Sequence, residues 1–268
     1  SSPPSLARSK CKAPMFSNVK YILLTAIRDR LFVGLLFGIA AASYICGVLG
    51  STAMLEPEAM TLSFTAATSR VIIMVGIIVF IGFHVRNAFD SKEIDVLLSR
   101  PISRTTLVVS YWLGFAVVAT ILAIPAIAII AYLGILNQTG FIVWSISLLL
   151  ESWLVVAIAL FASFTLKSGV SSVLSSLAMY SISRMIGFFL ATLQSGIIFQ
   201  SEILHVTAKW TITIISTIIP RLDFFAKSGW LIYGPKSYED ALLCLYQAAI
   251  FIPLLIAASV IDFKRKQF

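Results

Sequence analysis

The chain has 268 residues, of which 59% are hydrophobic and only 12% are charged, and its net charge is +8. A soluble domain has about 45–50% apolar and about 25% charged residues, so this composition excludes a soluble enzyme, a secreted disulfide-stabilised domain and a nucleic-acid-binding module. One membrane-spanning helix needs about 20 apolar residues, which leaves material for roughly five to seven spans. The sequence therefore predicts an all-α integral membrane protein with a single transmembrane domain over residues 1–268.

The first predicted element is a short amphipathic helix at residues 15–30. Apolar residues recur at helical spacing from Phe16 to Ile27, while Lys20 and the charged run 28–30 interrupt any spanning pattern. This pattern favours an elbow helix that lies in the membrane interface with its basic residues at the lipid headgroups. The alternative is a solvated lead-in to the first span.

The first span is predicted at residues 31–49 and carries small residues on one face, at Gly34, Gly38 and Ala42. Small residues at this spacing allow another helix to approach closely. We interpret this face as a helix-packing surface, with contact between two copies of the chain as one use.

Five further apolar stretches follow. The third of the six spans contains Pro125, which predicts a kink because a proline inside a helix removes a hydrogen bond. Between the last two spans, residues 200–240 are mixed in character, and we expect their apolar part, 203–219, to be re-entrant or interfacial on the outer side. The five spans that follow the first one are predicted at 60–83, 107–136, 141–166, 170–199 and 241–261.

Basic residues are distributed unequally between the two sides of this six-span arrangement. Fourteen of the 20 Lys and Arg residues fall on the side of the termini. The positive-inside rule therefore places both termini in the cytoplasm. If residues 203–219 also crossed, the basic cluster 264–266 would be exported, which argues against a seventh span.

Three charged residues lie inside the predicted spans: Arg70, Glu151 and Arg184. Glu151 and Arg184 lie almost equally far from the turn at 167–169, about 23–26 Å at 1.5 Å per residue, and Arg70 lies about 21 Å from residue 84. All three would then share the outer half of the bilayer, where an unpaired charge costs at least a few kcal/mol. We therefore expect a Glu151–Arg184 ion pair, either structural or with a role in substrate binding or gating.

Catalytic and metal-binding motifs are absent from the sequence. It contains no H-E-x-x-H, no G-x-S-x-G and no G-x-x-x-x-G-K-[ST] phosphate-binding loop. The two histidines, His84 and His205, are assigned to opposite sides of the membrane. We therefore expect no catalytic residue, metal or cofactor in this chain.

The longest charged run between spans, residues 84–104, contains a predicted cytoplasmic helix at 90–101. Its apolar residues fall on one helical face, and Pro101 ends the helix before the next span begins. Such a helix suits docking into the groove of a partner protein; the alternative is a solvated connector. The candidate contact residues are Glu93, Ile94, Asp95, Leu97, Leu98, Arg100 and Pro101.

Four segments together carry a family resemblance. They are Ile27-Arg28-Asp29-Arg30-Leu31-Phe32, the Leu-Leu-Ser-Arg-Pro-Ile-Ser-Arg stretch at 97–104, Tyr111 with Gly114, and Pro220-Arg221-Leu222-Asp223-Phe224-Phe225. With the order of elbow, six spans and outer segment, they resemble the membrane subunits of ABC-2 type transporters (type V exporters), especially the single-domain permeases of bacteria.

The resemblance implies a bacterial inner-membrane permease that exports an amphipathic or hydrophobic cargo. It implies a second permease copy, in a homodimer or a heterodimer, and two cytoplasmic ATPase subunits that bind ATP and Mg. Residues 90–101 would be the coupling helix seated on the ATPase, and short helices in 200–240 would close the exit. Membrane lipids are further expected partners, and nucleic acid is not. The alternatives are an assembly or scaffold subunit without transport activity and, less favoured, an intramembrane enzyme.

Overall fold

The computed structural model describes residues 19–26, 28–54, 56–91, 103–194, 202–235 and 238–265, and all regular structure within these ranges is helical. Six helices are long and apolar enough to cross a membrane, so the predicted all-α membrane architecture with six candidate spans is confirmed. They are α2 (Arg30–Ser51), α3 (Pro57–Asp90), α5 (Arg104–Leu133), α6 (Gln138–Thr165), α7 (Gly169–Gln194) and α10 (Tyr238–Arg265). Between α7 and α10 lie α8 (Glu202–Ile218), the 3-10 helix η1 (Leu222–Phe225) and α9 (Trp230–Tyr233).

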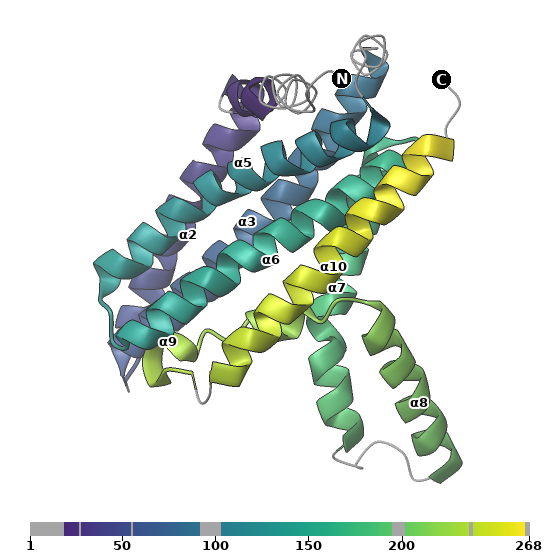
Figure 1. Cartoon of the computed structure of the whole chain (residues 1–268). Coiled ribbons are helices and arrows are strands. Elements are labelled where there is room, and N and C mark those ends of the chain that lie inside the picture. The colour runs from purple at the N-terminus through teal and green to yellow at the C-terminus, as the bar shows by residue number, and fades with distance from the viewer. Residues whose placement is uncertain are drawn as a thin grey trace, which may run out of the picture.

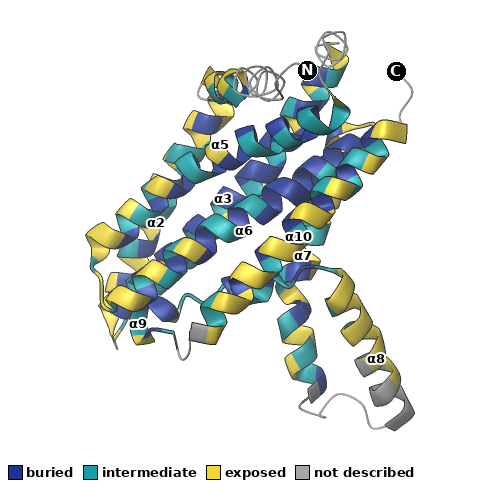
Figure 2. Cartoon of the chain, viewed as in Figure 1, coloured by how far each residue is buried: buried dark blue, intermediate teal, exposed yellow. Residues whose placement is uncertain are grey.

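Helices α3 and α6 form the centre of the bundle (Figure 1). Helix α3 packs against α2, α5, α6 and α7, and α6 also packs against α5, α7, α9 and α10. Figure 2 shows the consequence for burial, because buried residues concentrate on α3 and α6 while α2, α8 and α10 present mostly exposed residues. A buried charge on α3 or α6 therefore has protein rather than lipid around it.

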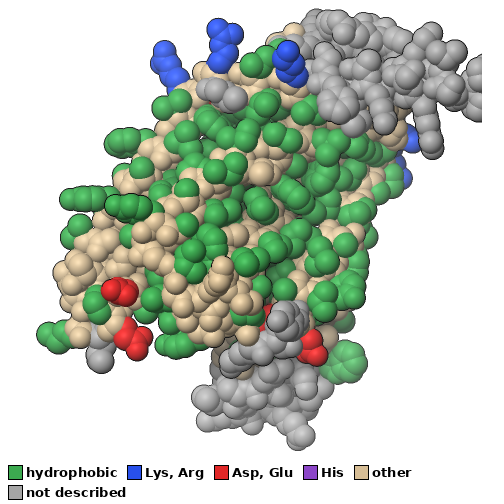
Figure 3. All heavy atoms as spheres, turned by 60° about the vertical axis from the view of Figure 1, so that its left-hand side comes forward, with side chains coloured by type: hydrophobic (Ala, Val, Ile, Leu, Met, Phe, Trp, Pro, Cys, Tyr) green, Lys and Arg blue, Asp and Glu red, His purple; other side chains and the backbone are tan. Residues whose placement is uncertain are grey.

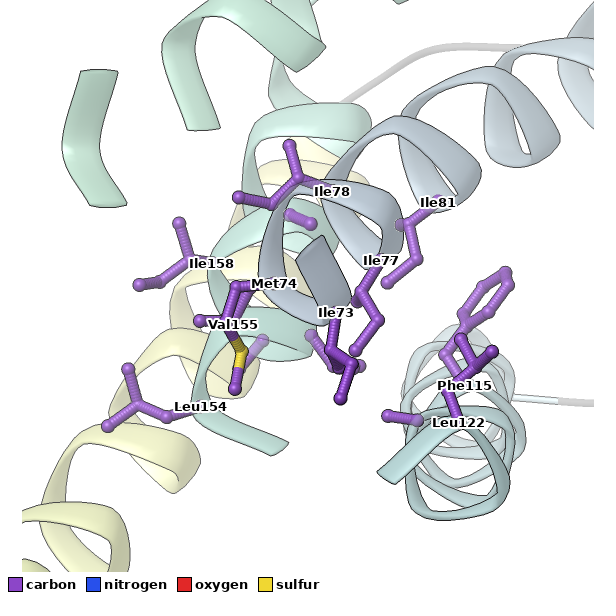
Figure 4. Packing of buried hydrophobic residues seen from close by; sticks show 14 of the residues in the cluster. Ile73, Met74, Ile77, Ile78, Ile81, Phe115, Leu122, Leu154, Val155 and Ile158 are labelled. Atoms are coloured by element: carbon purple, nitrogen blue, oxygen red, sulfur yellow. The ribbon is translucent and has the colours of Figure 1, made fainter. Parts of the chain in front are cut away.

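The core between α3, α5 and α6 consists of aliphatic side chains at helical spacing. Ile73, Met74 and Ile77 of α3 are buried and point toward residues of the two neighbouring helices, including Leu122 and Val155 (Figure 4). Lipid tails are as apolar as these side chains, so the helices associate through close van der Waals packing rather than through release of water. This packing fixes the rotation of α3 about its axis and with it the direction of its polar residues.

Helix α3 is longer than its predicted span. It continues seven residues past Phe83, to Asp90, and Ser91 caps it. Hydropathy reports the apolar length of a helix and not its full helical length, so this extension had no apolar signal. The coupling helix was predicted to begin at residue 90, which instead belongs to α3. The other predicted helix ends differ little from the observed ones. Helix α5 continues through Pro125 and ends at Leu133, three residues before the predicted end at 136. It ends there because Gly134 has a φ of +122°, which is not helical.

The N-terminal described segment, residues 19–26, is helical and lies across the end of α2 (Figure 1). A corner follows at Asp29, whose carboxylate accepts a hydrogen bond from the backbone N–H of Leu31 (3.0 Å) and caps α2. Ile22 is buried against Gly114 of α5, where an added Cβ would lie 2.8 Å from the Ile22 Cδ1 atom. The segment predicted as an elbow is therefore packed on the bundle through Ile22.

The outer segment contains one long helix, α8, that packs against α7. Figure 1 shows α8 and the adjacent half of α7 projecting beyond the ends of the other helices, and not folding back between them. The position of 203–219 as a re-entrant or interfacial segment stays a prediction. Trp210, Ile214 and Ile218 on α8 are exposed in the isolated chain.

On one face of the bundle, exposed charged side chains are separated by sign. On the face shown in Figure 3, Lys and Arg side chains lie at one end and Asp and Glu side chains at the other. The helical segment 19–26 and the C-terminal end of α10 also lie at this basic end (Figure 1). This distribution agrees with the side on which the positive-inside rule places the cytoplasm.

Candidate functional site

The three charged residues inside the spans come together in one cluster. The Arg70 Nη1 atom of α3 lies 2.6 Å from Glu151 Oε2 of α6, and the Arg184 Nη1 atom of α7 lies 2.8 Å from Glu151 Oε1. Each carboxylate oxygen of Glu151 therefore accepts one guanidinium. The predicted Glu151–Arg184 pair is present, and Arg70 is its third member. Glu151 lies midway along α6, about 20 Å from either helix end.

Arg70 is almost completely satisfied by protein. Besides the carboxylate, its Nη1 donates to the Phe225 carbonyl of η1 at 2.7 Å. Its Nη2 donates to the Ser147 hydroxyl at 3.0 Å and to the Trp144 carbonyl at 3.3 Å, and its guanidinium lies over the Trp144 ring at 5.1 Å. The side chain is 1% exposed. A buried charge with this many acceptors holds α3, α6 and η1 in one arrangement.

The α6 side of the cluster follows from helical spacing. Trp144, Ser147 and Glu151 are three and four residues apart, so they lie on one face of α6, and all three are buried. Ser147 also lies within hydrogen-bond distance of the Phe225 carbonyl, at 3.2 Å. Polar residues on one stripe of an apolar helix face protein because lipid offers them no partner.

Arg184 is different from Arg70. Its side chain is 23% exposed, and among the described residues its only hydrogen bond is the one to Glu151. A guanidinium has five N–H donors, so most of those of Arg184 have no acceptor in the described part of the chain. Two guanidiniums share one carboxylate, and the three-residue cluster has a net charge of +1.

The outer segment reaches the same region through η1. Asp223 pairs with Arg221 at 2.8 Å, and Arg221 lies over the Phe224 ring at 4.1 Å. The Asp223 carboxylate approaches α7 so closely at Gly187 that a Cβ there would collide with it. Counting Asp223 and Arg221 as a neutral pair leaves the excess positive charge of the cluster unchanged.

Two further groups of residues were predicted to be functional: the contact residues of the coupling helix and the small-residue face of α2. Glu93, Ile94, Asp95, Leu97, Leu98, Arg100 and Pro101 lie outside the described residues. Among the described residues, an added Cβ at Gly34 would meet no atom within 4 Å, and one at Gly38 would meet Ile72 of α3 at 3.9 Å, an ordinary contact. The closest glycine contacts between α2 and α3 are Gly50 against Thr61 and Gly76 against Leu35. The use of Gly34, Gly38 and Ala42 as a packing face therefore stays a prediction.

Sequence reasoning missed the partners that the cluster finds on other elements. Ser147 and Trp144 could have been found, since they lie one and two turns from Glu151. Phe225 contributes a backbone carbonyl, which has no signature in the sequence. Within the described ranges, no three His, Cys, Asp or Glu side chains gather in a way that could hold a metal ion.

Comparison with known proteins adds no identification. No family model matches the chain, and no curated protein sequence matches it.

Proposed function

We propose that the chain is the membrane-spanning permease subunit of an ATP-binding cassette exporter of the ABC-2 type. It would work in a bacterial inner membrane with both termini in the cytoplasm. A separate cytoplasmic ATPase would bind ATP and Mg and supply the energy, and the cargo would be amphipathic or hydrophobic. The six candidate spans, the sidedness of charge and the sequence resemblance support this assignment.

One observation carries the proposal: α3 is an unbroken helix that connects the predicted ATPase-docking stretch with the outer segment. Arg70 lies 20 residues before Asp90, which is about 30 Å at 1.5 Å per residue. The coupling residues follow directly after α3, and Arg70 donates to the Phe225 carbonyl of η1. A tilt of the cytoplasmic end of α3 would therefore be transmitted to η1 through a buried charged contact.

This geometry gives the transport cycle a physical form. Closure of the ATPase subunits would displace the coupling residues and tilt α3 as a rigid element. Packed cores change between discrete arrangements rather than deforming continuously, so the permease would rock between two states. In the outward state η1 would separate from the position that Arg70 holds here, and the exit would open.

A second copy of the chain would complete the permease. Helix α2 is one of the two least buried spans, and Gly34 on it has open space around it. A helix of another copy could approach the face formed by Gly34, Gly38 and Ala42 as closely as small residues allow. The translocation path would then lie between two copies.

The proposal is tested by purifying the tagged full chain from its native membrane. An ATPase chain with a phosphate-binding loop should co-purify, and ATP should drive cargo movement in proteoliposomes. Leu97→Ala with Leu98→Ala should separate ATP hydrolysis from transport, whereas the matched change Leu242→Ala with Leu243→Ala, at exposed positions on α10, should not. A scaffold subunit would instead purify without an ATPase and show no response to ATP, and that result would overturn the assignment.

A further inference from the structure

The region around Arg184 has more positive charge than the protein neutralises. Three guanidiniums (Arg70, Arg184, Arg221) face two carboxylates (Glu151, Asp223). Arg70 uses four donor contacts and Arg221 is paired, so the excess is located at Arg184, which makes a single contact. A net charge in a membrane-embedded region attracts a counter-charge.

Two buried hydroxyls in the same stretch of α7 have no hydrogen-bond partner among the described residues. Tyr180 is 6% exposed and Ser183 is 0% exposed, and neither hydroxyl has a hydrogen-bond partner in the described part of the chain. Serines elsewhere in the spans donate to a carbonyl four residues earlier, as Ser176 and Ser259 do. A buried polar group left unpaired is costly, so the unpartnered Tyr180 hydroxyl one turn from Arg184, a guanidinium with a single contact among the described residues, indicates a missing acceptor.

Tyr180 and Arg184 lie on one face of α7, because they are one turn apart. Ser183, the residue directly before Arg184, is turned about 100° away from it around the helix. An anionic group held by Arg184 would therefore have the Tyr180 side chain on its own face of α7.

The surroundings indicate the other half of the ligand. Phe188 lies one turn beyond Arg184 and is 65% exposed. Met185 and Phe189, which lie one turn apart beside Phe188 on α7, are also exposed. A small hydrated anion would gain nothing from this apolar surface, whereas a molecule with an anionic head and an apolar tail would use both.

We propose that Arg184, with the hydroxyl of Tyr180, binds the phosphate or carboxylate group of an anionic amphiphile, whose apolar part lies along the Phe188 side of α7. As a statement about cargo this rests on the proposed transport function. As a binding site it does not, since the ligand contacts only this chain.

The test uses the purified full chain in nanodiscs of phosphatidylcholine, without ATP or ATPase. Binding of dihexanoyl phosphatidic acid is measured by thermophoresis, with dihexanoyl phosphatidylcholine and inorganic phosphate as separate probes. The wild type should bind phosphatidic acid at least about 10-fold more tightly than either other probe, because phosphatidylcholine carries a choline cation that cancels its phosphate charge and inorganic phosphate has no apolar part.

Variants locate the site. Arg184→Gln should weaken binding of phosphatidic acid about 10-fold or more, and Tyr180→Phe about 3-fold or more; Arg184→Lys should retain part of the affinity. The matched controls Arg28→Gln and Tyr132→Phe, at exposed positions, should bind within about 2-fold of wild type. If Arg184→Gln does not fold, Tyr180→Phe with its control decides alone.

Three results would overturn the site: equal binding by Arg184→Gln and wild type, loss of binding in Arg28→Gln instead, or binding of inorganic phosphate as tight as that of phosphatidic acid. Failure of the transport proposal would be seen separately, as a missing ATPase, and would leave Arg184-dependent binding in place. Loss of the site would equally leave ATPase coupling intact.

Discussion

Glu151 is the residue whose loss the structure predicts to be most damaging. It is 0% exposed and supplies the carboxylate for both Arg70 and Arg184. Glu151→Gln keeps the shape of the side chain and removes its charge, so two guanidiniums would be left against each other within the membrane-spanning bundle. Removing one partner of a buried ion pair typically costs about 3–5 kcal/mol.

The same reasoning predicts a smaller effect for Arg184→Gln. This change leaves the Arg70–Glu151 contact and the three other acceptors of Arg70 in place, and the lost side chain is 23% exposed. A partly exposed pair contributes about 1 kcal/mol or less. In the double variant, removal of Arg184 should relieve part of the repulsion created by Glu151→Gln, so the two effects should not add.

Thermal unfolding of the purified full chain in one detergent measures which of these changes destabilises the protein more. At about 2–4 °C per kcal/mol, Glu151→Gln should lower the Tm by roughly 6–20 °C, and Arg184→Gln by about 4 °C or less. Glu151→Asp, which keeps the charge, is the matched control and should lie between them. Equal losses for Glu151→Gln and Arg184→Gln, or a change of less than about 2 °C for Glu151→Gln, would refute the account of the cluster.

Three further predictions concern other parts of the molecule. Gly140→Ala should lower the free energy of unfolding by about 1–3 kcal/mol, because a Cβ at this position would collide with the Trp230 carbonyl of α9. The control Gly47→Ala should be neutral, since an added Cβ there has no atom within 4 Å. Equal effects of the two changes would contradict the close contact of α6 and α9. Gly34→Leu should weaken association of two copies in analytical ultracentrifugation, with Gly47→Leu as control, and an unchanged dimer would remove α2 from the interface. A reporter fused after residue 268 should be active in the cytoplasm; a signal from the outer side would contradict the six-span arrangement.

Much of the fold could be predicted because lipid imposes a simple requirement on sequence. Each span needs a long apolar run with few charges, and the short polar breaks at 137–140 and 167–169 separate such runs clearly. Helix ends were harder. Hydropathy ends with the bilayer, while α3 continues to Asp90, and a conformational feature such as the positive φ of Gly134 ends α5 without any change in hydropathy.

The site was predictable only where geometry is local. Glu151 and Arg184 flank one short turn, so equal distances from that turn placed them at the same depth. Arg70 is on α3, far away in sequence, and its approach to Glu151 depends on how α3 packs against α6. The Phe225 carbonyl could not have been found, since any residue at that position has the same backbone group. The spacing of Gly34, Gly38 and Ala42 predicted a packing face but did not identify its partner, because spacing does not say which helix approaches.

The central claim is that ATP bound outside this chain moves its outer end. It is tested most directly by pulsed electron–electron resonance on the full complex with its ATPase. Each copy of the chain carries one spin label at Thr139→Cys, an exposed position at the outer end of α6. The native cysteines Cys11, Cys46 and Cys244 are replaced first. The account predicts a single distance between the two copies that shifts when ATP and Mg are added, and no shift in the variant with Leu97→Ala and Leu98→Ala. A distance between copies that is the same with and without ATP would contradict it.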